Sequence, residues 1–231
     1  MSQFLQNLHT PVDASWHNFL TTRRKSQIRS IEKKIAGDEI RPDQSRVLHF
    51  LTVPLDKIQV IILGQDPYPA PDAATGRAFE VGTLTDWSQP FRQGSLKNIV
   101  RLIYKTYYGE ERSFKAIRDW NHNSKAILPP HKLFKSWEKQ GVLLLNTALT
   151  CKTGVSASHS SLWQNFSGEL LRYINNFKPE AHWILWGGHA QKITADLELQ
   201  NPYASNHPMM CSAKNSNDFL YGGLNTYETT K

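Results

Sequence analysis

The stretch that decides the fold is residues 59–82, which read QVIILGQDPYPAPDAATGRAFEVG. Residues 60–63 form a continuous apolar run, which is typical of a strand buried on both faces of a parallel sheet. Gly64 ends this run, and the carboxylate of Asp66 follows beside Pro67. Because open α/β sheets bind ligands at the carboxyl ends of their strands, the segment is a candidate functional loop. A plain turn explains it equally well at this point, since Gly, Asp and Pro are common turn residues.

Two further apolar runs have the same character. Residues 142–145 (VLLL) end in Asn146, and residues 183–186 (WILW) end in a pair of glycines. A shorter strand is expected near residues 203–205, and apolar residues at helical spacing separate and flank these runs. The predicted helices cover residues 14–36, 43–51, about 95–107, 133–139, 158–177 and 189–197, with a last helix starting near 215.

The alternation of strands and helices predicts an α/β fold with a central four-stranded, mostly parallel sheet and helices on both faces. At 231 residues the chain is long enough to bury a sizeable core in one such domain. We expect a single domain over residues 1–231. Within it we expect a helical region at about 14–51, a sheet core at about 58–206, and a C-terminal loop and helix at 207–231.

Composition narrows the partners and the compartment. The 27 basic and 20 acidic residues give a net charge of +7, which favours a polyanionic partner, although many basic proteins bind none. Two cysteines provide neither a disulfide framework nor a paired metal spacing, so a reducing compartment is expected. No secretory signal and no apolar stretch of membrane-spanning length is found. We therefore expect a cytoplasmic protein that does not bind membranes.

Polar side chains follow three of the apolar runs. Asp66, Asn146 and His207 each come after a predicted strand, and a parallel sheet would bring all three to one edge. A carboxylate, an amide and an imidazole together suit the polarisation of water and the recognition of a planar polar ligand. Taken singly, each has a simpler explanation, as a cap, a turn residue or a hydrogen-bonded loop histidine. Their convergence is what makes a catalytic site the stronger hypothesis.

Four motifs in the same order as in a known family support this hypothesis. They are GQDPY at 64–68, LLLNTALT at 143–150, WGGHAQK at 186–192 and HP at 207–208. Together they resemble family 1 uracil-DNA glycosylase, and the resemblance extends from about Trp16 to the predicted last helix. It implies an enzyme that flips deoxyuridine out of DNA and hydrolyses its N-glycosidic bond, without a metal or cofactor.

The resemblance also implies a role for each matching pocket residue. Asp66 would orient the attacking water and stabilise the cationic sugar, while neutral His207 would donate a hydrogen bond to uracil O2. The amide of Asn146 would read the polar edge of uracil. Phe79 would stack on the flipped base, and Tyr68 would stand against C5, where a thymine methyl would clash. The backbone of Gln65 would help to close the pocket.

A second group of residues would bind the DNA itself. By resemblance, three serines would contact phosphates beside the extruded nucleotide, and a loop would fill the gap that it leaves in the duplex. The serines are Ser95, Ser158 and Ser212, and the loop is Pro208, Met209, Met210, Cys211 and Ser212. The family has Leu where this chain has Cys211, which is too small for a wedge, so we expect Met209 or Met210 to replace it.

The chain departs from the family at other points near the chemistry. Pro69 stands where the family has His, and Ala157 replaces a second His near the catalytic aspartate. Both changes bear on how water is positioned. Arg77 replaces a Leu and adds a charge close to Phe79. Recognition of uracil is therefore expected to be retained, while DNA clamping and flipping are altered.

Three functions follow from the sequence. The first is uracil excision from single- or double-stranded DNA by a monomer, with a DNA-mimicking inhibitor protein as a further partner. The second is a binding module of the same fold with weak or lost excision, recruited to DNA or to a protein. The third is action on another base. Against it, Asn146 disfavours cytosine and Tyr68 disfavours thymine.

Overall fold

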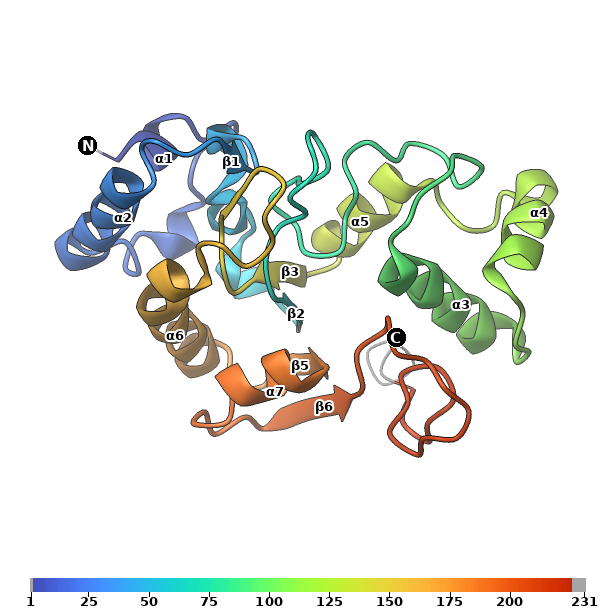
Figure 1. The fold of residues 1–231 in the computed structure, drawn as a ribbon. Coiled ribbons are helices and arrows are strands. Elements are labelled where there is room, and N and C mark those ends of the chain that lie inside the picture. Colours follow the sequence, from blue (N-terminus) through green and yellow to red (C-terminus); the bar gives the residue numbers. More distant parts are fainter. Residues whose placement is uncertain (1, 226–231) are drawn as a thin grey trace.

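The computed structural model describes residues 2–225 and is built on one four-stranded sheet. Its strands lie in the order β3-β2-β5-β6, and all three neighbouring pairs are parallel (Figure 1). The strands are β2 (Val60–Gly64), β3 (Val142–Asn146), β5 (His182–Trp186) and β6 (Asn201–Ser205). The predicted α/β class, the strand number and the parallel arrangement are confirmed.

The apolar runs form strands because their alternate residues enter two different cores. In β2, Ile61 and Leu63 face one core while Val60 and Ile62 face the other. β3 and β5 divide their side chains in the same way. Since successive side chains of a strand point to opposite faces, a strand covered on both sides must be apolar throughout.

The first core lies under the N-terminal part of the chain, and Figure 1 shows α2 and α6 on that side of the sheet. The helical elements that contribute to it are α1 (Gln3–Gln6), the 3₁₀ turn Ala14–Trp16, α2 (Thr22–Lys34), α6 (Ser160–Phe177) and α7 (Gly188–Ile193). A separate two-stranded antiparallel ribbon joins β1 (Ile40–Arg41) to β4 (Cys151–Lys152).

The second core lies on the other face of the sheet, under helices from the middle of the chain (Figure 1). These are α3 (Gly94–Tyr108), α4 (Phe114–Ser124) and α5 (Pro130–Lys139). α4 was not predicted, although the hydroxyl of Ser113 caps it by accepting the backbone N–H of Ala116. Helices on both faces of the sheet are therefore confirmed.

Three helix predictions need correction. Residues 14–36 do not form one helix, because the chain turns after Trp16 and starts again at Thr22, capped by Thr21. Residues 43–51 form two 3₁₀ turns, Gln44–Arg46 and His49–Thr52, and a third turn covers Leu55–Lys57.

The predicted last helix is also wrong over the described residues 215–225, which form successive turns. The buried carboxylate of Asp218 organises them by accepting backbone N–H groups of Ser212, Leu220 and Tyr221, at 2.5, 2.7 and 3.0 Å. Phe219 and Leu220 are buried, as their apolar spacing predicted, but they enter the core from turns and not from a helix. Residues 226–231 lie outside the described part. Among the helices described, none has the length and hydropathy to cross a membrane.

Candidate active site at the strand ends

A cavity of about 460 Å³ opens where β2, β3 and β5 end. Its lining brings together Asp66, Asn146 and His207, which lie in three separate parts of the sequence. The register explains the meeting, because Gly64 pairs with Asn146 and Trp186 pairs with Ser205, two residues before His207. The other predicted residues in the lining are Gln65, Tyr68, Phe79, Ser95 and Met209.

The carboxylate of Asp66 is held by the loop that precedes α6. Its Oδ2 accepts a hydrogen bond from the Ser156 hydroxyl and another from the backbone N–H of Ala157, both 2.6 Å long. The loop is held in turn by the backbone N–H of Gly154, which donates to the carbonyl of Pro69 at 2.9 Å. The carbonyl of Pro69 thus joins the two loops through a backbone contact.

Asn146 ends β3 as a buried amide. Its Oδ1 lies so close to Gly64 that a Cβ on that residue would collide with it. Within residues 2–225, no protein group is recorded as a hydrogen-bond partner of this side chain. A buried amide keeps a donor and an acceptor available to a ligand when the protein does not use them.

His207 follows β6 and has a defined tautomer. The backbone N–H of Met209 donates to its Nδ1 at 3.2 Å, which places the proton of the neutral ring on Nε2. Desolvation by burial lowers the pKa of His207 below its usual value, which favours that neutral ring. Gly187 lets the imidazole approach the end of β5, because a Cβ there would lie 2.9 Å from the Cβ of His207.

Two aromatic side chains complete the cavity wall. Phe79 is held at φ +64°, an unusual conformation for a bulky residue, and its ring meets Trp186 edge-on with centroids 5.4 Å apart. The ring of His207 lies 6.2 Å from that of Phe79. Tyr68 is half-buried beside Asp66, and burial raises the pKa of its phenol.

Arg77 does not bring a free charge to the cavity. Its Nε and Nη2 donate to the two carboxylate oxygens of Glu138 on α5, at 2.6 and 2.8 Å, and its Nη1 donates to Glu80 at 3.0 Å. The guanidinium is therefore paired twice, and it fastens the segment that carries Phe79 to α5. His49 also binds Glu138, through Nε2 at 2.7 Å.

The predicted phosphate contacts are dispersed. Ser95 lies in the first turn of α3 and lines the cavity, whereas Ser158 and Ser212 do not. The hydroxyl of Ser158 donates to the carbonyl of Val155 and accepts the N–H of Lys152. Gln65 is exposed, and its carbonyl accepts hydrogen bonds from Ala148 and Thr147.

The loop after His207 presents two exposed methionines. Pro208 is buried, and its carbonyl accepts a hydrogen bond from the amide of Asn98 on α3 at 2.6 Å. Cys211 is half-buried and its thiol donates to the same carbonyl. Met209 is 62% exposed and Met210 is 70% exposed, although large apolar side chains are usually buried.

Three further lining residues were given no role from the sequence. They are Ser156, and Trp186 and His189 of the WGGHAQK motif; the Nε2 of His189 lies 2.7 Å from the hydroxyl of Thr147. That hydroxyl donates to Gln65, so His189 must donate to it. Burial lowers the pKa of His189. A histidine just after a strand-end glycine pair was the available signal.

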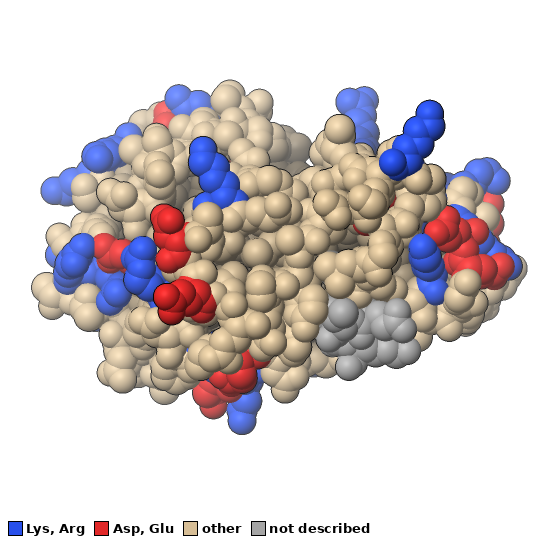
Figure 2. Space-filling model, turned by 90° about the horizontal axis from the view of Figure 1, so that it is seen from below, with Lys and Arg blue, Asp and Glu red and all other residues tan. Residues whose placement is uncertain are grey.

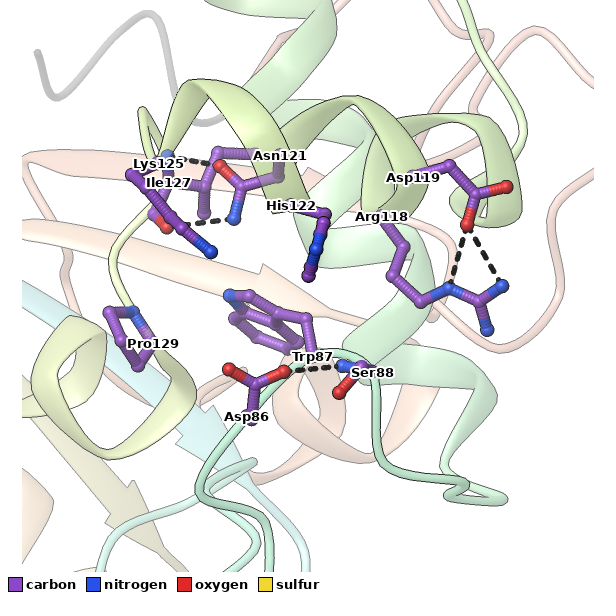
Figure 3. Close-up of a pocket in the computed structure, with 10 residues that line it drawn as sticks. All are labelled: Asp86, Trp87, Ser88, Arg118, Asp119, Asn121, His122, Lys125, Ile127 and Pro129. Atoms are coloured by element: carbon purple, nitrogen blue, oxygen red, sulfur yellow. Dashed lines mark hydrogen bonds and ion pairs between the residues drawn. The ribbon is translucent and has the colours of Figure 1, made fainter.

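A second cavity, of about 420 Å³, lies between α4 and the segment around Trp87. Figure 3 shows that several of its polar groups bind one another: Arg118 pairs with Asp119, Asp86 accepts the N–H of Ser88, and the amide of Asn121 binds the backbone of Ile127. Asp66, Asn146 and His207 meet in the first cavity and not in this one, so we place the chemistry at the strand ends.

Across residues 2–225, no group of three or more His, Cys, Asp or Glu side chains is arranged to hold a metal ion. Figure 2 shows one face of the molecule, on which Lys and Arg lie around the edge, with acidic side chains among them, and the central part is neutral.

Comparison with known proteins decides the family. A family model described as the uracil DNA glycosylase superfamily matches residues 52–223. Uracil-DNA glycosylase of Escherichia coli O6:H1 is 32% identical over 213 residues, which cover 87% of this chain and 83% of that protein.

Solved structures agree with the family match. The UNG of Nitratifractor salsuginis superposes with a TM-score of 0.70 at 25% identity, covering 90% of this chain and 88% of that one. A variant of mimivirus UNG in complex with UGI superposes with a TM-score of 0.65 at 26% identity, covering 89% and 72%. The family model spans most of the chain and the strand-end cavity lies within it, so the chain belongs to the uracil DNA glycosylase superfamily.

Proposed function

We propose that this protein is a uracil-DNA glycosylase, which extrudes deoxyuridine from DNA and hydrolyses its N-glycosidic bond to leave an abasic site. The observation that carries the proposal is the meeting of Asp66, Asn146 and His207 in one cavity of a chain from this family. A base inside a duplex cannot be attacked, so the cavity must receive a flipped nucleotide. The match to a named uracil-DNA glycosylase favours this enzyme over a binding module without activity.

Asp66 acts on the water and on the sugar. The C1′–N1 bond breaks and its electron pair stays on N1, so uracil leaves as an anion while positive charge develops on the sugar. The carboxylate stabilises that charge and orients water, whose oxygen bonds to C1′ while one of its protons passes to Asp66. Oδ1 of Asp66 is available for both roles, because the two donors found among the described residues bind Oδ2.

His207 stabilises the departing base. Charge on the uracil anion spreads to O2, where a hydrogen bond is stronger in the transition state than in the ground state. The Nδ1 of His207 already accepts the N–H of Met209, so Nε2–H is the donor that remains for O2. The ring performs this role while neutral.

The remaining pocket residues select uracil. The amide of Asn146, which has no hydrogen-bond partner among the described residues, matches the alternating acceptor and donor of the uracil edge. Phe79 offers a face for stacking, Tyr68 closes the space at C5, and the backbone of Gln65 borders the base. Their presence in one lining supports uracil over thymine or cytosine.

DNA contacts lie around the mouth of the cavity. Ser95 binds a phosphate at the cavity, and Ser158 and Ser212 stay predicted phosphate contacts outside its lining. The loop of Pro208, Met209, Met210, Cys211 and Ser212 enters the base stack. Met210 is the better wedge, because it is the more exposed and Met209 lies near the start of α3. A monomer, a cytoplasmic location and absence of cofactor stay predictions. An inhibitor protein also stays a proposed partner, supported by the UGI complex of mimivirus UNG.

A uracil-release assay with Asp66→Asn tests the function. The wild type should release uracil from an oligonucleotide that contains one deoxyuridine, and the variant should be slower by about two to four orders of magnitude, because a catalytic carboxylate is lost. The exposed Asp196→Asn is the matched control and should keep the wild-type rate. A wild type that binds the oligonucleotide at low salt but releases no uracil would instead support the binding module.

A further inference from the structure

We infer that Ser156 is a positioning residue, which holds the carboxylate of Asp66 in the orientation that the attacking water requires. This inference rests on the proposed function. The Ser156 hydroxyl donates to Oδ2 of Asp66 at 2.6 Å, across 90 positions of sequence. It is the one side chain recorded as a hydrogen-bond donor to Asp66 within residues 2–225.

Two donors on one oxygen determine the carboxylate plane. The backbone N–H of Ala157 also reaches Oδ2 at 2.6 Å, from the residue next to Ser156. One donor leaves a carboxylate free to rotate about it, whereas two donors from adjacent residues restrict that rotation and are individually strong because the acceptor is charged. Oδ1 is then left without a donor of its own among the described residues. Because the carboxylate is already oriented, less free energy of substrate binding has to be spent on orienting it, and the activation barrier is lower.

The loop that carries Ser156 is itself anchored at several points. The N–H of Thr153 donates to the carbonyl of Glu39 at 2.8 Å, and the N–H of Gly154 donates to that of Pro69 at 2.9 Å. Ser158 closes the other end through its contacts with Lys152 and Val155. The position of the Ser156 hydroxyl is therefore determined by the fold and not by Asp66 alone.

A purely structural role explains the contact less well. Ser158 uses its hydroxyl within the loop, but the recorded bond of the Ser156 hydroxyl goes to Asp66 and to no group of its own loop. Ser156 also lines the cavity and is exposed, so it contributes little to the core.

The test compares Ser156→Thr with Ser156→Val, two variants of nearly equal shape that differ by a hydroxyl. Single-turnover excision with excess enzyme on a deoxyuridine duplex measures the chemical step, and a titration measures DNA affinity. Ser156→Thr should stay within about threefold of the wild-type rate. Ser156→Val and Ser156→Ala should be about tenfold slower or more, with DNA affinity unchanged, because a hydrogen bond to a charged group is lost. Ser26→Val, at an exposed position of α2 outside the cavity lining, is the control and should be unchanged.

A double-mutant cycle separates positioning from any independent effect. In an Asp66→Asn background, Ser156→Val should cost almost nothing further, because its effect passes through the carboxylate. Additive losses, equal rates for the Thr and Val variants, or a loss confined to DNA affinity would each overturn the inference while leaving the proposed function intact. A wild type that releases no uracil would overturn both.

Discussion

The tautomer of His207 is imposed by its own loop. Once the N–H of Met209 occupies Nδ1, the neutral ring has its donor at Nε2, and protonation would set an N–H on Nδ1 against the N–H of Met209. Burial opposes protonation as well, since it lowers the pKa of His207. Charging the ring would leave the Nε2–H donor in place but would break the contact with Met209 that orients the ring and the loop of residues 208–212.

This arrangement predicts how the excision rate declines at acid pH, which is the acid limb of the pH–rate profile. Because the pKa of His207 lies below its usual 6.5, excision should stay constant from pH 8 to 6.5 and decline only at lower pH, as the ring gains a proton. Single-turnover rates across pH 4.5–8 measure the limb. In His207→Asn, which does not titrate, the rate should drop by about 10²–10³-fold and this limb should vanish. An unchanged limb in that variant would assign it to another group.

At the scale of elements, the conformation of the wedge loop, residues 208–212, depends on a contact with α3. The amide of Asn98 holds the carbonyl of Pro208, and Cys211 folds back to the same oxygen. These two contacts leave the side chains between them outside the core, which explains why two methionines stay exposed. An unbranched thioether side chain adapts to an irregular gap, such as the space that a flipped nucleotide leaves in a base stack.

The loop therefore predicts a difference between duplex and single-stranded substrates. Met210→Ala should lower excision from a duplex by about tenfold, because nothing fills the emptied stack, and should change excision from a single strand by less than about twofold. Met210→Leu keeps an apolar wedge and should retain most of the duplex rate. Met209→Ala should have the smaller effect. If neither alanine variant altered duplex binding or excision, the wedge would have to lie elsewhere.

Over the whole molecule, features that depend on residues close in the sequence could be predicted, and features that depend on contacts between distant side chains could not. The strands were predictable because burial on both faces demands contiguous apolar residues, and the strand-end positions of Asp66 and Asn146 follow from that. The turns around Asp218 were not, because one buried carboxylate organises them through backbone groups that no spacing reveals. The Ser156–Asp66 contact was equally hidden, since only the packing of two loops brings the partners together. The sequence alone identified Arg77 as a departure from the family pattern, but it could not predict that Arg77 pairs with Glu138.

Glu138 ties distant parts of the molecule together and should govern its acid stability. Burial alone would raise the pKa of Glu138, but hydrogen bonds from His49 and Arg77 outweigh burial and lower it to about 2. A lowered folded-state pKa stabilises the protein above the unfolded value of 4.5, and this contribution, on the order of 2 kcal/mol, is lost as pH falls from there toward about 2. Glu138→Gln should therefore unfold more easily at pH 7, by about 2 kcal/mol, because Arg77 keeps Glu80 but loses one of its two carboxylate partners.

Urea unfolding at pH 7, 5, 4 and 3 measures this dependence, and the gap between wild type and Glu138→Gln should narrow as the pH falls. The control is Asp119→Asn, which breaks exposed ion pairs with Lys115 and Arg118 and should leave the free energy of unfolding nearly unchanged. A gap that stayed constant down to pH 3 would mean that Glu138 is not held ionised by Arg77. In that case the segment carrying Phe79 would owe its position to the backbone bond from Ala78 to Leu144, rather than to the ion pair on α5.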